Sequence, residues 1–127
     1  MKDYNIKACY FKLAAKNPDA ISVNPNTPPW FVGGVAEELI CNKDLYERYY
    51  KKLDITLDDF IEEYTKQLVK LNPYEILEKY EGKILLGWYS PDQFDTRQII
   101  IEWIKQTTGY VIEDLTKETY QGIYSAV

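Results

Sequence analysis

Residues 83–89 constrain the fold more than any other segment, because they form an almost uninterrupted apolar run, Lys83-Ile84-Leu85-Leu86-Gly87-Trp88-Tyr89. A strand buried on both faces has this composition, and such strands belong to parallel sheets that helices cover. The next four residues, Ser90-Pro91-Asp92-Gln93, have the form of a helix capping box that contains proline. We therefore predict a strand at 83–89 and a helix directly after it.

A second strand after that helix completes a larger unit. The predicted helix should end near Gly109, and the apolar residues 110–112 that follow have the composition of a strand. A strand, a helix and a strand in this order form a right-handed parallel crossover. The predicted fold class is therefore α/β, with a small parallel or mixed sheet and helices on both of its faces.

The first third of the chain supplies two more predicted strands, at residues 6–11 and 20–23. Residues 24–29 contain three prolines, so no helix and no central strand can run through them. We predict an ordered loop or an extended sheet edge there, continued by residues 30–34.

Between these segments and the 83–89 strand, the apolar residues recur three and four positions apart, which is the period of one helix face. Three helices are predicted, at residues 42–53, 56–71 and 72–82. Asn42, Thr56 and Asn72 have the side chains that cap helix N-termini, and Pro73 stands at the first helical position that proline favours.

The length and composition predict one soluble domain. The chain has 127 residues, 46% of them hydrophobic and 28% charged, which is ordinary for a single globular domain at 1–127. No run approaches the ~18 apolar residues of a membrane helix, and no apolar stretch of signal-peptide type follows the N-terminus. We therefore expect a cytoplasmic protein without a membrane partner.

The residue types that are missing exclude several chemistries. The chain has no histidine, which excludes Ser-His-Asp triads, Cys-His pairs and histidine metal sites. Its two cysteines, Cys9 and Cys41, lack C-x-x-C spacing, so a structural zinc site is excluded as well. We predict two free, buried thiols, and neither a metal nor a cofactor.

The charge balance argues against nucleic acid as a partner. The net charge is −5, the only arginines are Arg48 and Arg97, and the longest basic run is Lys51-Lys52. Proteins that bind phosphate backbones present basic stripes with arginine forks. Two interpretations of the acidity remain: the surface could imitate nucleic acid, or moderate acidity could simply keep the protein soluble.

In open α/β sheets, ligands bind outside the carboxyl ends of the strands, which here predicts a site at residues 88–97. The N–H groups that begin the following helix favour an anion there, and the helix dipole disfavours a cation such as Arg97. Arg97 should therefore face an anion, either a ligand or, in a local surface ion pair, Asp92 or Asp95. Four aromatic residues could stack on a planar ring or pack in the core instead: Tyr10, Trp30, Trp88 and Tyr89.

Five short motifs occur in a characteristic order: Asp19-Ala20-Ile21-Ser22, Pro29-Trp30-Phe31-Val32-Gly33, Glu63-Tyr64-Thr65, Leu85-Leu86 and Glu102-Trp103-Ile104. In this order and spacing, the chain resembles the small uncharacterised domain-of-unknown-function family number four-eight-eight over residues 6 to 114. The resemblance leaves residues 116–127 as a tail.

The resemblance also implies a site that this chain has lost in part. The family carries a phenylalanine-cysteine-histidine-arginine block at the helix start, of which this chain keeps Phe94 and Arg97. Asp95 and Thr96 stand where the family has cysteine and histidine, and Asn24 stands where it has an arginine. On the strand, Gly87 and Tyr89 replace the family's cysteine and glutamate. If the block is an active site, its thiol and imidazole are missing here.

We therefore predict non-catalytic binding of a small anionic, nucleotide-like ligand at the end of the 83–89 strand. A phage counter-defence sponge that sequesters a nucleotide signal would have such a degenerate site. The predicted ligand-binding residues are Tyr10, Asn24, Trp30, Trp88, Tyr89, Ser90, Asp95, Thr96 and Arg97.

Two other function classes remain open. The chain could be a hydrolase that acts on a nucleotide-type substrate through Asp95 or Asp92. It could also be an acidic interaction module or inhibitor that engages a protein through Asp58-Asp59 and Glu62-Glu63. In the tail, Tyr120, Ile123 and Tyr124 are spaced to cover a surface. The tail could therefore form either a homo-oligomer contact or a lid.

Overall fold

The computed structural model describes residues 4–90 and 93–116, and within them the sheet has five strands in the order β3-β2-β4-β1-β5. Every pair of neighbouring strands is parallel. The strands are β1 (Lys7–Tyr10), β2 (Ala20–Ser22), β3 (Gly34–Val35), β4 (Ile84–Gly87) and β5 (Glu113–Asp114). The predicted α/β class is therefore confirmed.

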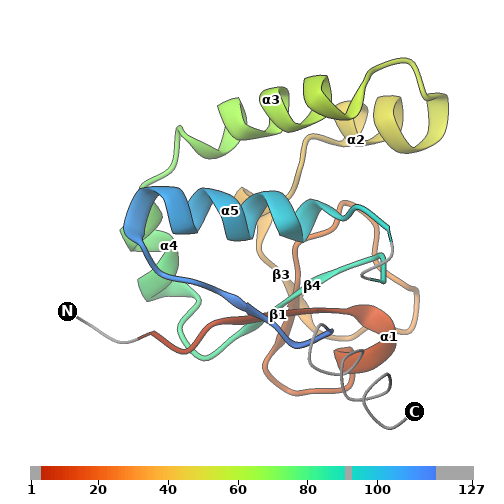
Figure 1. Cartoon of the computed structure of the whole chain (residues 1–127). Helices are drawn as coiled ribbons and strands as arrows, with labels where there is room; N and C mark the ends of the chain where they lie inside the picture. Colours follow the sequence, from red (N-terminus) through yellow and green to blue (C-terminus); the bar gives the residue numbers. More distant parts are fainter. Residues whose placement is uncertain (1–3, 91–92, 117–127) are drawn as a thin grey trace, which may run out of the picture.

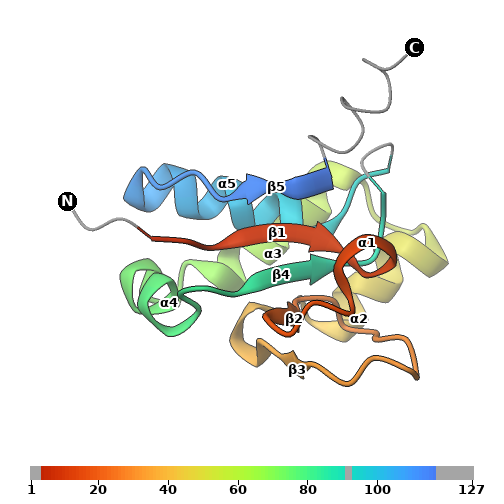
Figure 2. The ribbon, with the colours of Figure 1, turned by 90° about the horizontal axis from the view of Figure 1, so that it is seen from below.

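The helices are α1 (Phe11–Ala14), α2 (Lys43–Glu47), α3 (Leu57–Leu68), α4 (Pro73–Lys79) and α5 (Thr96–Thr108), with a 3₁₀ turn, η1 (Glu37–Leu39), and a π-helical turn, η2 (Arg48–Lys52). Figure 1 shows α5 above the sheet and α3 above α5. The short α1 lies at the carboxyl end of β1 on the opposite face, in front of the strands in Figure 2. Helices thus lie on both faces, as predicted.

Side chains alternate between the two faces of the central strands. Ala8 and Leu85 belong to the larger apolar core beneath α3 and α5, whereas Cys9, Ile84 and Leu86 belong to a smaller cluster on the face of α1. All four residues of β4 are buried, which matches a strand covered on both faces.

The three predicted helix caps are confirmed. The Asn42 side chain accepts hydrogen bonds from the backbone N–H groups of Asp44 (3.0 Å) and Leu45 (3.3 Å). Thr56 and Asn72 cap α3 and α4 in the same way, because their side-chain oxygens lie within hydrogen-bond distance of the first-turn N–H groups.

The predicted cap at Ser90 is wrong. Helix α5 begins at Thr96, and its N-cap is Asp95, whose carboxylate accepts the N–H of Thr96 at 2.9 Å. Strand β4 correspondingly ends at Gly87, two residues earlier than predicted. Pro91 and Asp92 lie outside the described residues, as do the tail residues Tyr120, Ile123 and Tyr124.

The strand predicted at 110–112 is also wrong, because the edge strand is β5, at Glu113–Asp114. Helix α5 ends as predicted at Gly109, in the left-handed conformation (φ 81°) that glycine adopts easily. After this helix, the Tyr110 side chain contacts the backbone before β1 where a paired strand was expected. Its hydroxyl accepts the N–H of Ile6 (3.1 Å) and lies 3.0 Å from the carbonyl oxygen of Tyr4.

Both cysteines are buried free thiols, as predicted. Burial raises the pKa of the Cys9 thiol and raises that of Cys41 to about 12. Among the described residues, no helix has the length and apolar content that crossing a bilayer requires.

Candidate functional site

The carboxyl ends of β2 and β4 form the switch point of the sheet. The two strands are neighbours, with Ser22 opposite Leu86. The chain leaves β2 for β3, at one edge of the sheet, and leaves β4 for β5, at the other edge beyond β1. The connections therefore diverge between β2 and β4, which is where open α/β sheets hold their ligands. Trp88 follows β4 and Asp95 lies against Gly87, so both residues of the predicted segment border this place.

Arg97 lies beside the switch point, at the carboxyl ends of β1, β4 and β5, and is fully buried. Its Nη1 forms an ion pair with Asp95 and donates to the carbonyl oxygen of Tyr89 at 2.6 Å. Its Nε donates to Asp114 at 3.2 Å, and its guanidinium lies 5.7 Å from the centre of the Tyr10 ring. Arg97 thus connects the ends of β1, β4 and β5.

The anions that Arg97 meets are therefore Asp95 and Asp114. Sequence reasoning named Asp95 as one of its partners but expected a surface pair, whereas the observed pair has no exposed side-chain area. Asp114 was missed, because it comes from β5 and nothing local in the sequence connects it with Arg97. A ligand could reach this guanidinium only if one of the two carboxylates were displaced.

Asp95 is held from several sides. Its carboxylate accepts the N–H groups of Thr96 (2.9 Å) and Trp88 (3.4 Å) in addition to pairing with Arg97. Burial raises the pKa of this carboxyl above its ordinary range, although Arg97 acts in the opposite direction. The side chain has no solvent exposure, so in this conformation it offers no base to an external substrate.

Thr96 begins α5 and is also fully buried. Among the described residues, its hydroxyl has no hydrogen-bond partner. A buried hydroxyl normally finds one, so this position holds unused hydrogen-bonding capacity at the N-terminus of a 13-residue helix.

Asn24 and Tyr89 also make contacts within the protein. The buried Asn24 side chain accepts the N–H of Asn26 at 2.9 Å, which orders the start of the proline-rich loop, and lies 3.4 Å from the hydroxyl of Tyr46. The half-buried Tyr89 ring stacks on Tyr50 with 5.0 Å between ring centres. Ser90 follows and is half-buried.

The two tryptophans of the predicted site are exposed, but they lie in different surroundings. Trp88 is 41% exposed and packs edge-to-face on Phe11, with 5.7 Å between ring centres. Trp30 is 58% exposed and lines a cavity of about 590 Å³. The walls of that cavity come from the segments that enter β2 and β3: Ala15, Lys16, Asn17, Pro18, Ala20, Trp30, Val32 and Gly33.

The predicted site residues therefore do not converge on one pocket. Tyr10 ends β1, and Asp95, Thr96 and Arg97 lie near it at the carboxyl ends of β1 and β4, whereas Trp30 borders a cavity beside the amino ends of β2 and β3. Lys16 and Asn17 also line that cavity and were not predicted. Their exposed position in the turn before β2 gave no signal in the sequence.

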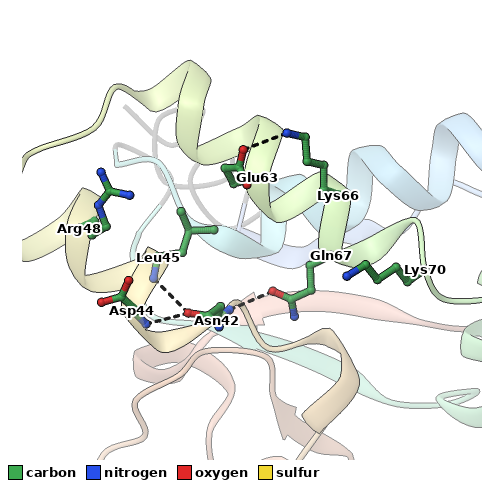
Figure 3. Close-up of a pocket in the computed structure, with 8 residues that line it drawn as sticks. All are labelled: Asn42, Asp44, Leu45, Arg48, Glu63, Lys66, Gln67 and Lys70. Atoms are coloured by element: carbon green, nitrogen blue, oxygen red, sulfur yellow. Dashed lines mark hydrogen bonds and ion pairs between the residues drawn. The ribbon is translucent and has the colours of Figure 1, made fainter.

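A larger cavity of about 630 Å³ lies between α2 and α3 and is lined by polar and charged residues (Figure 3). Two of its three lining cations have an anion beside them: Arg48 lies 3.0 Å from Asp54, and Lys66 lies 3.0 Å from Glu63, toward which it points in Figure 3. Exposed pairs of this kind do not concentrate charge of one sign, so this cavity has no evident ligand class.

No family model, curated protein or solved structure matches the chain. The resemblance to family four-eight-eight therefore stays a prediction, and the function has to be argued from the residues themselves.

Proposed function

We propose that this protein binds a small anionic, nucleotide-like ligand without converting it. The observation that carries the proposal is the cavity of about 590 Å³ that Trp30 and Lys16 line together. This volume lies within the ~300–1,000 Å³ of typical small-molecule pockets.

The two side chains match the two parts of a nucleotide. Trp30 leaves 58% of its surface exposed, and a planar base that stacks on it would cover part of this apolar area. Lys16 is an exposed cation on the same cavity, and lysine binds phosphate as a point charge. Each contact alone is weak, so selectivity would come from their occurrence in one cavity.

Gly33 gives this cavity its shape. A Cβ atom at Gly33 would approach the carbonyl oxygen of Ala20 to 2.7 Å and would overlap the Phe31 ring. The loop after Trp30 can therefore lie tightly against β2 only with glycine there. Phe31 in turn packs on Phe11 with 5.1 Å between ring centres, which anchors the loop to the face of α1.

The residues around Arg97 have a supporting role in this proposal. Arg97, Asp95 and Asp114 tie together the ends of the strands, and Asp95 is too enclosed to take a proton from bound substrate. The described part of the predicted hydrolase site thus supports binding without turnover, which is what sequestration of a nucleotide signal requires.

The test is calorimetric titration with adenosine monophosphate, adenosine and inorganic phosphate as separate probes. We expect Trp30→Ala to weaken binding of the monophosphate about tenfold or more, since base stacking is worth ~1–3 kcal/mol and ~1.4 kcal/mol is a factor of ten. Lys16→Gln should weaken binding of the monophosphate but not of adenosine. Lys12→Gln is the matched control, because Lys12 is an exposed lysine of α1 that does not line the cavity.

Chromatography of the probe after incubation should recover it unchanged. Release of adenosine or adenine that Asp95→Asn abolishes would support the hydrolase alternative instead. Absence of monophosphate binding, or binding that Trp30→Ala leaves intact, would remove the proposed site.

A further inference from the structure

An apolar groove runs along the outer surface between α3 and α5, which lie side by side in Figure 1. It encloses about 420 Å³. One wall is lined by Ile61 and Thr65 of α3 and by its C-cap residue Val69, and the other by Ile99, Trp103 and Thr107 of α5. Each set repeats at every fourth residue, so both walls extend over about two helical turns.

The floor of the groove is apolar and deep. Ile99 and Trp103 are each only 5% exposed although they border it, whereas Val69 at its margin is 60% exposed. The indole N–H of Trp103 is buried and, among the described residues, has no hydrogen-bond partner. An apolar floor with an unused donor is unusual for a helix surface that faces only water.

The margins of the groove carry more negative than positive charge. Glu102 is its one charged lining residue within the described chain. On α3, helical spacing places Asp58 and Glu62 on the solvent side of Ile61 and Thr65, and both are exposed. Two exposed lysines stand beside these three carboxylates: Lys66, which lies 3.7 Å from Glu62 but points toward Glu63 at 3.0 Å in Figure 3, and Lys105, three residues after Glu102.

We infer that this groove is a docking site for one amphipathic helix of a partner protein, with an apolar stripe for the groove and lysine or arginine on its flanks. The groove is lined by two helices over about two turns, which suits the helix-in-groove mode of recognition. The acidic margins select a basic helix through charge complementarity. They also oppose a second copy of this chain, which would bring the same carboxylates against each other.

Fluorescence anisotropy with a labelled synthetic peptide tests the inference. The peptide is about 14 residues long, the length of about four helical turns, with leucine along one face and lysine along the flanks. Two control peptides replace lysine with glutamate or scramble the order of the same residues. We expect saturable binding of the basic amphipathic peptide and at least about fivefold weaker binding of either control.

The variants locate the site. Thr65→Tyr should fill the centre of the groove and abolish binding, while a melting curve confirms that the variant is folded. Glu62→Lys should weaken binding at least about fivefold. Glu63→Lys is the matched control, since Glu63 is its sequence neighbour but faces the cavity beside α2.

Equal binding of the scrambled peptide, or equal loss in Glu62→Lys and Glu63→Lys, would reduce the interaction to general charge attraction and overturn the inference. A concentration-dependent dimer in sedimentation that Thr65→Tyr disrupts would assign the groove to a second copy and overturn it as well.

Discussion

The carboxylate of Asp95 occupies the space directly beside the α-carbon of Gly87. A Cβ atom placed on Gly87 would overlap both the Oδ2 atom and the carboxyl carbon of Asp95. These residues are eight positions apart in the chain, one in a buried strand and the other at the cap of α5. The side chain of Asp95 thus lies where the strand would otherwise present a side chain of its own.

We therefore expect Gly87→Ala to lower the free energy of unfolding by ~1–3 kcal/mol, the usual cost of overpacking a core. Gly34→Ala is the control, because a Cβ there would meet only the Ile21 side chain at an ordinary 3.9 Å. Urea denaturation of both variants measures the difference. Equal stability of Gly87→Ala and the parent would mean that Asp95 moves aside without cost.

Arg97→Met should destabilise the protein by ~3–5 kcal/mol, because it leaves the buried carboxylates of Asp95 and Asp114 without their cation. The sequence alone suggested a surface pair, whose loss costs at most ~1 kcal/mol. Arg48→Met provides that comparison within the same chain, since its pair with Asp54 at 3.0 Å is about half exposed. Urea denaturation should place the two variants several kcal/mol apart.

The same free energy for both variants would show that the buried pair contributes no more than the exposed one. If Arg97→Met lowers the affinity for adenosine monophosphate while the melting temperature stays unchanged, Arg97 is a ligand-binding residue, as the sequence predicted.

The sequence predicted what local chemistry determines. Asn42, Thr56 and Asn72 bond to N–H groups two or three residues away, so their roles are visible in a short stretch of sequence. The run at 83–89 likewise carries its own burial pattern. Four of the five helices and the parallel sheet follow from signals of this kind.

The features that the sequence did not predict are contacts between residues that are far apart in the chain. Arg97 pairs with Asp114 across 17 positions, and Tyr110 bonds to Ile6 across 104. Capping at Asp95 instead of Ser90 depends on the space above Gly87, which only the folded chain creates. The cavity at Trp30 was missed for the same reason, since Lys16 and Trp30 meet only through the pairing of β2 and β3.

The stability should respond to pH through Asp95. Because burial raises its pKa in the folded state, the folded protein binds this proton more tightly than the unfolded chain. Stability from this group is fully present below the ordinary aspartate range near ~4 and is lost as pH rises through the raised pKa. Relative to Asp95→Asn, the parent should therefore lose free energy of unfolding as pH increases.

Glu38 should act in the opposite direction. Its burial alone would raise the pKa, but hydrogen bonds from Lys79 and Tyr80 outweigh this and lower it. Its contribution is present above the ordinary glutamate range and is lost as pH falls through the lowered pKa. Denaturation of Glu38→Gln and Asp95→Asn across pH 3–7 should give difference curves of opposite slope, and slopes of the same sign would contradict one of the two assignments.

The two cysteines should be chemically inert in the folded protein. Burial raises the pKa of both thiols, that of Cys41 to about 12, so the reactive thiolate is scarce at neutral pH. Thiol titration should count two groups after denaturation without reductant and almost none before it. Iodoacetamide should leave ligand binding unchanged. Protection of a fast-reacting thiol by adenosine monophosphate would instead place a cysteine in the binding site.

Tyr110→Phe should destabilise the protein by ~1–3 kcal/mol. The Tyr110 hydroxyl accepts the N–H of the buried Ile6, which precedes β1, so its removal leaves a buried donor unsatisfied. The same hydroxyl lies 3.0 Å from the carbonyl oxygen of Tyr4, and the two rings pack edge-to-face at 5.8 Å. Phenylalanine keeps that ring contact, so the measured loss reports on the hydrogen bonds alone.

Tyr74→Phe, at a side chain 54% exposed, should change stability by less than ~0.5 kcal/mol. Amide exchange at Ile6 supplies the local readout: it should accelerate in Tyr110→Phe and stay slow in Tyr74→Phe, and slow exchange in both would show that another group protects this N–H.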